Sequence, residues 1–255
     1  MSPQDPPDGD GPERGRLVGR RADSRPENAL EWAHWTLRTE QPTVAFVREV
    51  VGSVLGVVLV GLLLFAISGI WPPMVAVESG SMQPHMYRGD LVFIMEPHRL
   101  SPSYATDGTG VVTYQVAAAH DGYRKFGDYG DVIVYRANGG DGTPVIHRAR
   151  FWVSKGENWV PRANPNYLPA RTCSVVPNCP APHAGFITKG DHNDRYDQVA
   201  GISGPVRPSW VKGTAEFRIP WLGYVRLYFS ELQLTGPPVA GPAGVLASGA
   251  SLSAA

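Results

Sequence analysis

One apolar run constrains this chain more than any other feature. Residues Val50–Ile70 form a stretch of 21 residues without a charge. As a helix with about 1.5 Å rise per residue the run extends roughly 31 Å, which matches a hydrocarbon core of about 30 Å. A buried core helix or a pair of strands is the alternative, but uncharged runs this long are typical of membrane helices. We therefore predict a transmembrane helix over residues 50–71.

The position of this run and its flanking residues predict how it is used. It begins too far from the first residue for a typical secretory signal peptide, and Trp71-Pro72-Pro73 offers no small-residue cleavage site. Arg38 and Arg48 precede the run, whereas the first basic residue after it is Arg88. Positive charge favours the cytoplasmic side. We expect an uncleaved, single-pass anchor in the cell membrane, with a cytoplasmic N-terminus and an extracytoplasmic remainder.

The segments at the two ends have compositions unlike the rest. Residues 1–28 are rich in Pro, Gly, Asp and Arg, so we expect disorder there. Residues 29–48 fit either a short helix ending at Pro42 or a loosely ordered juxtamembrane stretch, and we treat residues 1–49 as one cytoplasmic segment. Residues 231–255 predict a flexible tail rich in Gly, Pro, Ala and Ser, because prolines and weak hydrophobicity argue against a second span.

Residues 72–230 are the only segment able to form a globular domain, and their pattern predicts a mostly β fold. The chain has 29 Gly and 24 Pro among 255 residues, and its formal net charge of zero argues against a nucleic-acid partner. Residues 100–130 are expected to form an extended loop or a hairpin insertion. Short β-like runs separated by turn residues occur at 74–77, 91–94, 132–135, 145–153 and 186–188.

A serine-containing turn follows the predicted anchor closely. Residues 78–84 read Glu-Ser-Gly-Ser-Met-Gln-Pro, and a serine beside a glycine at a strand end can present its hydroxyl openly. Taken alone, the Ser-Gly-Ser spacing is also ordinary turn chemistry.

The order of five motifs gives this turn a stronger interpretation. Ser79-Gly80-Ser81-Met82-x-Pro84 with the following Arg88-Gly89-Asp90 resembles the nucleophile motif of type I signal peptidases. A histidine stands where the common bacterial enzymes have lysine, which resembles the archaeal and endoplasmic-reticulum branch. The other motifs that resemble this family, in its order, are Gly130 to Tyr135, Val145 to Arg148, Lys189 to Asn193 with Asp197, and Pro205 to Gly213.

The resemblance implies a role for each of five residues. Ser81 would be the nucleophile, and His147 would be general base and then general acid. Ser79 would offer its hydroxyl to the oxyanion, together with the backbone N–H of Ser81. Asp197, with Asp191 close by, would orient and stabilise the histidine, and which of the two contacts His147 stays open. His192 departs from the asparagine that is common in the family.

The same resemblance implies a fold and a function. The fold would be two antiparallel sheets with few helices, and the activity would be cleavage of signal peptides from exported precursors after small residues at positions −1 and −3. Partners would be signal peptides and the lipid bilayer, with the translocation channel as a further candidate, and no cofactor is expected. Met82 is expected to line a shallow apolar pocket. The alternatives are an inactive membrane-anchored module that binds exported chains or a translocation partner, and a related peptidase with one dedicated substrate.

The strand pattern around His147 supports a buried role for this residue. In a strand, Val145, His147, Ala149, Phe151 and Val153 would share one apolar face. A core histidine bonded to a backbone carbonyl is the alternative. The other histidines stand in Pro-, Gly- or Asp-rich surroundings and are expected to be solvated; they are His34, His85, His98, His120, His183 and His192.

Three further patterns carry weaker predictions. Ser203 lies in a sequence similar to a chymotrypsin-like nucleophile loop but lacks the preceding Asp, and the EF-hand-like start at Asp191 is broken by Arg195, so neither predicts a site. Cys173 and Cys179 are expected to form a disulfide outside the cytoplasm, with free thiols or an incomplete metal site with His183 as alternatives. Residues 219–229 fit either a membrane-interface segment or a final core strand.

Overall fold

The computed structural model describes residues 41–106, 108–120 and 122–234, together with isolated residues 28, 30, 32 and 38; for 229–234 it describes the backbone only. The chain divides into two units, residues 1–59 and 60–255. The predictions for residues 1–27 and for most of 29–40 lie outside the described part. So does the predicted tail beyond Leu234.

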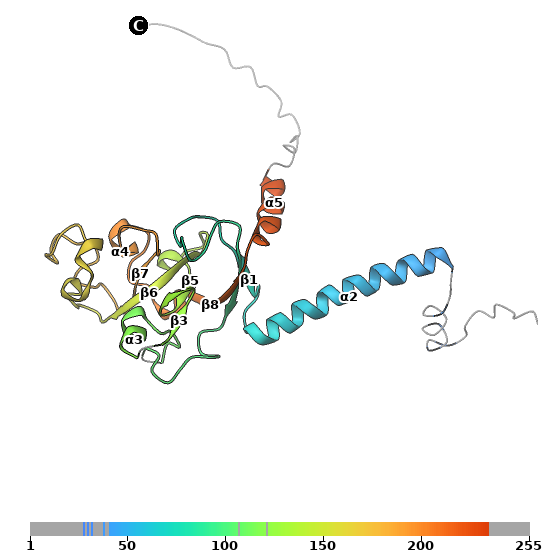
Figure 1. Cartoon of the computed structure of the whole chain (residues 1–255), viewed down its shortest axis with the longest axis horizontal. Helices are drawn as coiled ribbons and strands as arrows, with labels where there is room; N and C mark the ends of the chain where they lie inside the picture. Colours follow the sequence, from blue (N-terminus) through green and yellow to red (C-terminus); the bar gives the residue numbers. More distant parts are fainter. Residues whose placement is uncertain are drawn as a thin grey trace, which may run out of the picture. The chain divides into compact units, whose positions relative to one another are not determined.

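Helix α2, Pro42–Ser68, contains most of the predicted membrane span (Figure 1). It is long and apolar enough to cross a membrane, and nearly all its apolar side chains are exposed. Proline suits the first turn of a helix because its missing N–H has no partner there, which explains a start eight residues before Val50. The helix ends at Ser68, whose Oγ donates to the carbonyl of Ile94 at 2.7 Å.

The domain after α2 is built on one antiparallel sheet, which confirms the mostly β prediction. Its six strands lie in the order β1-β2-β8-β5-β6-β7, and a separate hairpin consists of β3 and β4 (Figure 1). The last strand in sequence, β8, therefore lies in the middle of the sheet. The bounds are β1 Met74–Ala76, β2 Leu91–Met95, β3 Arg124–Lys125, β4 Asp128–Tyr129, β5 Val132–Tyr135, β6 Val145–Val153, β7 Gly185–Lys189 and β8 Val211–Ile219.

A bulge in β6 corrects the predicted single apolar face. The pairing of β6 with β7 shifts between Ala149 and Phe151. Ala149 packs in one core cluster with Ile133, whereas Phe151 packs in a different cluster with Ile187. An extra residue in one strand reverses the alternation beyond it. The prediction that Phe151 and Val153 share the face of His147 is therefore wrong, while the pattern holds up to Ala149.

Two helices, α3 and α5, occupy places where the sequence predicted a loop, a hairpin or a strand. Helix α3, Tyr114–Ala119, lies with the β3–β4 hairpin in the region expected to be a loop or hairpin, and Thr113 caps it by accepting from the N–H of Val116. Helix α5, Gly223–Leu234, follows β8, so the alternative of a final core strand over 219–229 is wrong beyond Ile219. The remaining helical segments are α4 Asp197–Ala200, η1 Ala137–Gly139, η2 Val160–Arg162, η3 Pro165–Tyr167 and η4 Pro208–Trp210.

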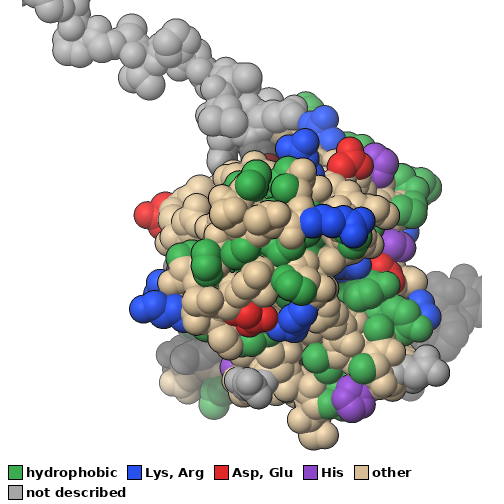
Figure 2. Space-filling view, turned by 90° about the vertical axis from the view of Figure 1, so that its left-hand side faces the viewer, with side chains coloured by type: hydrophobic (Ala, Val, Ile, Leu, Met, Phe, Trp, Pro, Cys, Tyr) green, Lys and Arg blue, Asp and Glu red, His purple; other side chains and the backbone are tan. Residues whose placement is uncertain are grey.

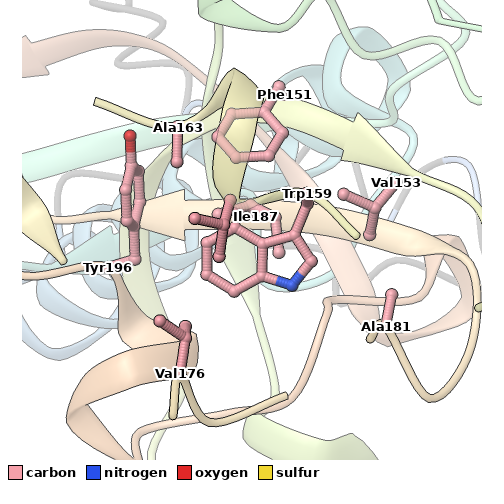
Figure 3. Close-up of a cluster of buried hydrophobic side chains, with 9 residues drawn as sticks. Phe151, Val153, Trp159, Ala163, Val176, Ala181, Ile187 and Tyr196 are labelled. Carbon is pink, nitrogen blue, oxygen red and sulfur yellow. The ribbon is translucent and has the colours of Figure 1, made fainter. Parts of the chain in front are cut away.

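The long connection between β6 and β7, residues 154–184, shares an apolar core with side chains of both strands (Figure 3). Trp159 is fully buried and packs against Phe151 of β6 and Tyr196, which precedes α4. The connection thus packs against the segment that begins α4.

Basic side chains are scattered among acidic and apolar ones on the face shown in Figure 2.

Candidate active site

Ser81 begins a tight turn that follows β1. Two methionines of this turn, Met82 and Met86, are fully buried and anchor it in the core. The N–H groups of His85 and Met86 both donate to the carbonyl of Met82, at 2.9 and 3.0 Å. Because the turn is fixed by buried side chains and backbone bonds, the Ser81 hydroxyl has a defined position at the surface of a pocket.

His147 lies on β6 and faces this hydroxyl. It is opposite Ile133 of β5 in the register and is 4% exposed. Its Nε2 lies 3.0 Å from Ser81 Oγ, and its Nδ1 lies 2.8 Å from Oδ2 of Asp197. With Nδ1–H donating to the carboxylate, Nε2 is free to accept from the serine hydroxyl.

Asp197 is the fully buried first residue of α4. Besides His147, its Oδ2 accepts from Tyr135 Oη at 2.8 Å and from Thr188 Oγ1 at 2.6 Å. Burial and the neighbouring Asp197 charge raise the pKa of Tyr135 well above its ordinary value, so this phenol stays a donor. The carboxylate is therefore held by three donors, of which His147 is one.

Sequence reasoning gave Tyr135 and Thr188 no role at the site. Both lie in segments that were predicted as strands. Tyr135 stands two residues after Ile133, which is opposite His147, and residues two apart in a strand share a face. The pairing of β5 with β6 was the missing information.

Asp191 has a different set of partners from Asp197. Its carboxylate accepts hydrogen bonds from Nε and Nη2 of Arg148, at 2.9 and 2.6 Å. It also lies 2.8 Å from Nδ1 of His85. Burial raises the pKa of Asp191, but the hydrogen bonds and charge of Arg148, with His85 adding to them, outweigh it and hold the pKa below its ordinary value. The structure thus brings Asp197 to His147, and Asp191 to the neighbouring Arg148.

Ser79 lies beside the nucleophile candidate, with its Oγ 3.2 Å from Ser81 Oγ. Both serines line a pocket of about 410 Å³. Met82 is fully buried in the core instead of lining this pocket, so that expectation is wrong. The walls are mostly apolar and come from β1, from the end of β5 and from the start of β6; they include Val75, Ala76, Val134, Pro144, Val145 and Ile146.

The turn after β7 lies directly against Ser81. A Cβ on Gly190 would lie 2.6 Å from the carbonyl oxygen of Ser81, so this close approach requires glycine. Lys189 Nζ donates to the carbonyls of Gly190 and Asn193, both at 2.7 Å. Burial is the main cause that lowers the pKa of Lys189. Through these bonds its ammonium group holds the turn in shape.

The remaining candidates lie apart from this arrangement. Cys173 and Cys179 form a disulfide in the connection between β6 and β7. Ser203 is buried and its hydroxyl contacts Asn138. Within the described ranges no three His, Cys, Asp or Glu side chains are grouped to hold a metal ion. His34 is outside the described residues, and His85 departs from the expected solvated role because it binds Asp191.

A serine hydroxyl bonded to a histidine, whose other nitrogen is bonded to a buried carboxylate, is the arrangement of serine hydrolases. The chain is similar to proteins named signal peptidase complex catalytic subunit: one from Neurospora crassa (27% identical over 162 residues), one from Tuber melanosporum (28% over 162) and one from Plasmodium falciparum (27% over 113). No family model matches the chain.

These similarities confirm the resemblance to the archaeal and endoplasmic-reticulum branch of type I signal peptidases that the motifs predicted. The similar region covers 62% of this chain and 64% of the relatives from N. crassa and T. melanosporum, and 44% and 46% in the P. falciparum comparison. The chain therefore matches less than two thirds of the length of these relatives.

Proposed function

We propose that this chain is a membrane-anchored serine endopeptidase that cleaves signal peptides from exported precursor proteins. The observation that carries the proposal is the chain of contacts from Ser81 Oγ to His147 (3.0 Å) and from His147 to Asp197 (2.8 Å), beside an apolar pocket. The similarity to signal peptidase catalytic subunits supports the same activity.

In this proposal His147 Nε2 takes the proton of Ser81 as Oγ attacks the scissile carbonyl. Asp197 stabilises the imidazolium that forms and keeps the ring oriented. His147 then gives its proton to the leaving amine, and a water molecule activated by the same imidazole hydrolyses the acyl-enzyme. The developing oxyanion would accept hydrogen bonds from the Ser81 N–H and from the Ser79 hydroxyl, which lies 3.2 Å from Ser81 Oγ.

The pocket supports a substrate with apolar side chains near the scissile bond. It has a volume of about 410 Å³, and its apolar lining residues include Val75, Ala76, Val145 and Ile146. The preference for small residues at positions −1 and −3 of a signal peptide is what the resemblance to signal peptidases implies.

The membrane would hold both the enzyme and its substrates. Helix α2 supports a single-pass anchor, and we expect the N-terminus in the cytoplasm with the β domain on the opposite side of the cell membrane. Trp221, Tyr224 and Tyr228 are 78%, 49% and 63% exposed, and such side chains favour the membrane interface. The relatives are named as subunits of a complex, so further partners, the translocation channel among them, belong to this proposal.

The test uses the full chain in bilayer vesicles with a radiolabelled precursor protein. Wild-type protein should release the signal peptide, and Ser81→Ala should lose several orders of magnitude in rate while inserting normally. Equal cleavage by both proteins would refute the serine mechanism. Binding of the precursor without cleavage by the wild type would favour the inactive binding module.

A further inference from the structure

His85 takes no part in the chain from Ser81 to Asp197, yet it touches the same turn. It lies four residues after Ser81, and its backbone N–H closes the turn on the carbonyl of Met82. Its ring Nδ1 lies 2.8 Å from Oδ2 of Asp191. The side chain of His85 is 26% exposed, whereas that of Asp191 is 4% exposed. A partly exposed side chain therefore binds a buried carboxylate.

The carboxylate of Asp191 is fixed from the other side by Arg148. The fully buried guanidinium makes two hydrogen bonds to it, at 2.9 and 2.6 Å. A bidentate pair of this kind sets both distance and orientation. Nη1 of Arg148 also donates to the carbonyls of Lys125 and Gly130, at 3.0 and 2.9 Å. Asp191 is thus attached to the residue next to His147 in β6.

A second contact joins the turn that begins at Ser81 to the turn after β7, which carries Asp191. The N–H of His192 donates to the carbonyl of Ser81 at 2.9 Å. The turn that carries Asp191 therefore meets the Ser81 turn twice, once at the backbone of Ser81 and once at the ring of His85. Two separated contacts prevent the two turns from rotating against each other, which a single contact would allow.

Together these contacts close a ring around the nucleophile and the base. The ring runs from Ser81 to His85 along the turn, to Asp191, to Arg148, to its neighbour His147, and back to Ser81. We propose that His85 is a positioning residue that holds Ser81 within hydrogen-bond reach of His147 through its contact with Asp191. This inference rests on the proposed function and adds to it a residue outside the triad.

The chemistry needs the donor at Nδ1 and not a charge on the ring. A neutral imidazole with its proton on Nδ1 donates to Asp191 as an imidazolium does. Asparagine carries an amide nitrogen at the same distance from Cβ, whereas leucine carries a methyl group there and cannot donate. His85→Asn and His85→Leu are therefore matched in shape and differ in the donor.

The experiment measures kcat, KM and thermal melting for full-length wild type, His85→Asn, His85→Leu and His85→Ala with one precursor. His85→Leu and His85→Ala should lose about ten- to a hundredfold in kcat with little change in KM, because a nucleophile misplaced by about 1 Å costs up to this much. His85→Asn should keep kcat within about threefold of the wild type. The control is His98→Leu, because His98 is also bound to a carboxylate, Glu96, but lies outside the ring.

The outcomes separate this inference from the proposed function. A wild type that needs Ser81, combined with unchanged kcat in His85→Leu and His85→Ala, overturns the positioning role alone. Equal losses in the Asn, Leu and Ala variants, or an effect confined to KM, also overturn it. A wild type that cleaves no faster than Ser81→Ala overturns both. Melting that falls equally in His85→Asn and His85→Leu while only the latter loses kcat supports the donor role.

Discussion

The hydroxyl of Tyr135 lies 2.8 Å from Oδ2 of Asp197, the same oxygen that is hydrogen-bonded to the ring of His147. A tyrosine from the middle of the sheet therefore shares a carboxylate with the proposed base. Since Oδ2 also receives Thr188, its position is set by two donors that do not take part in proton transfer. The aspartate is held by the sheet rather than by α4 alone.

Tyr135→Phe should lower kcat by about tenfold, because loss of one hydrogen bond to a charged group is worth about 1.5–3 kcal/mol and only part of this reaches the transition state. Thr188→Val should have a similar effect, and the double variant should lose less than the product of the two, since both donors hold one atom. Steady-state kinetics of the three variants check this. Fully multiplicative losses would show that the donors act independently.

Asp197→Asn should lower kcat by about 10³–10⁴-fold with little loss of thermal stability, because the amide keeps the shape but no longer stabilises the imidazolium. Turnover and melting temperature are measured on the same preparation. Turnover close to that of the wild type would remove Asp197 from the proposed triad.

Asp191→Asn, unlike Asp197→Asn, should lower the thermal stability of the protein. It removes the closer of two carboxylates from the buried guanidinium of Arg148 and leaves Asp128 at 3.9 Å, and breaking a buried ion pair from one side costs about 3–5 kcal/mol. A clear fall in melting temperature, with a smaller loss in kcat than in Asp197→Asn, is expected. If Asp191→Asn melts like the wild type and is the less active variant, the two aspartates exchange roles.

Reduction of the Cys173–Cys179 disulfide should destabilise the connection between β6 and β7. Asn178, inside the closed loop, donates to the carbonyl of Gln198 at 2.8 Å and accepts from Trp159 Nε1 at 2.8 Å. The loop-closure model gives about 2 kcal/mol for a ring this small. Melting with and without a reductant should show this loss, whereas a Cys173→Ser/Cys179→Ser variant should melt at the lower temperature under both conditions.

Asp131 should make stability depend on pH. Burial, the largest cause, raises its pKa from 3.8 to about 6, against the hydrogen bonds from Val112 and Tyr123. Because the folded state binds this proton more tightly, the stabilisation is complete below about pH 4 and is lost as pH rises through about 6. Between pH 4 and 8 the wild type should therefore lose up to about 3 kcal/mol relative to Asp131→Asn. A constant difference between their melting temperatures over this range would contradict the assignment.

The sequence predicted the parts of this structure that local patterns define. The apolar run, five of the strands and the serine-containing turn follow from hydrophobicity and turn residues, and the motif order brought Ser81, His147 and Asp197 together. Pairing between distant strands does not follow from local patterns. For that reason Tyr135, Thr188 and the salt bridge of Asp191 with Arg148 came only from the structure.

Two errors have local physical causes. The bulge between Ala149 and Phe151 is one inserted residue in an otherwise regular apolar run, and alternation alone cannot show it. Helix α5 begins at Gly223 after an apolar, aromatic stretch that fits a strand equally well. A glycine is needed there because a Cβ would lie 2.5 Å from the carbonyl of Asp90, a contact that only the folded chain makes.

The central place of β8 has a consequence for synthesis of the protein. Strands β1 and β2, which flank Ser81, meet the strands around His147 only through β8, which pairs with β2 on one side and β5 on the other. Until residue 219 has left the ribosome the sheet cannot join these two halves, and only turn contacts such as His192 N–H to the Ser81 carbonyl and His85 to Asp191 connect them. Such late, long-range pairing slows folding. The proposed peptidase would thus stay latent while its own chain is being translated, and would gain activity only when its last strand arrives.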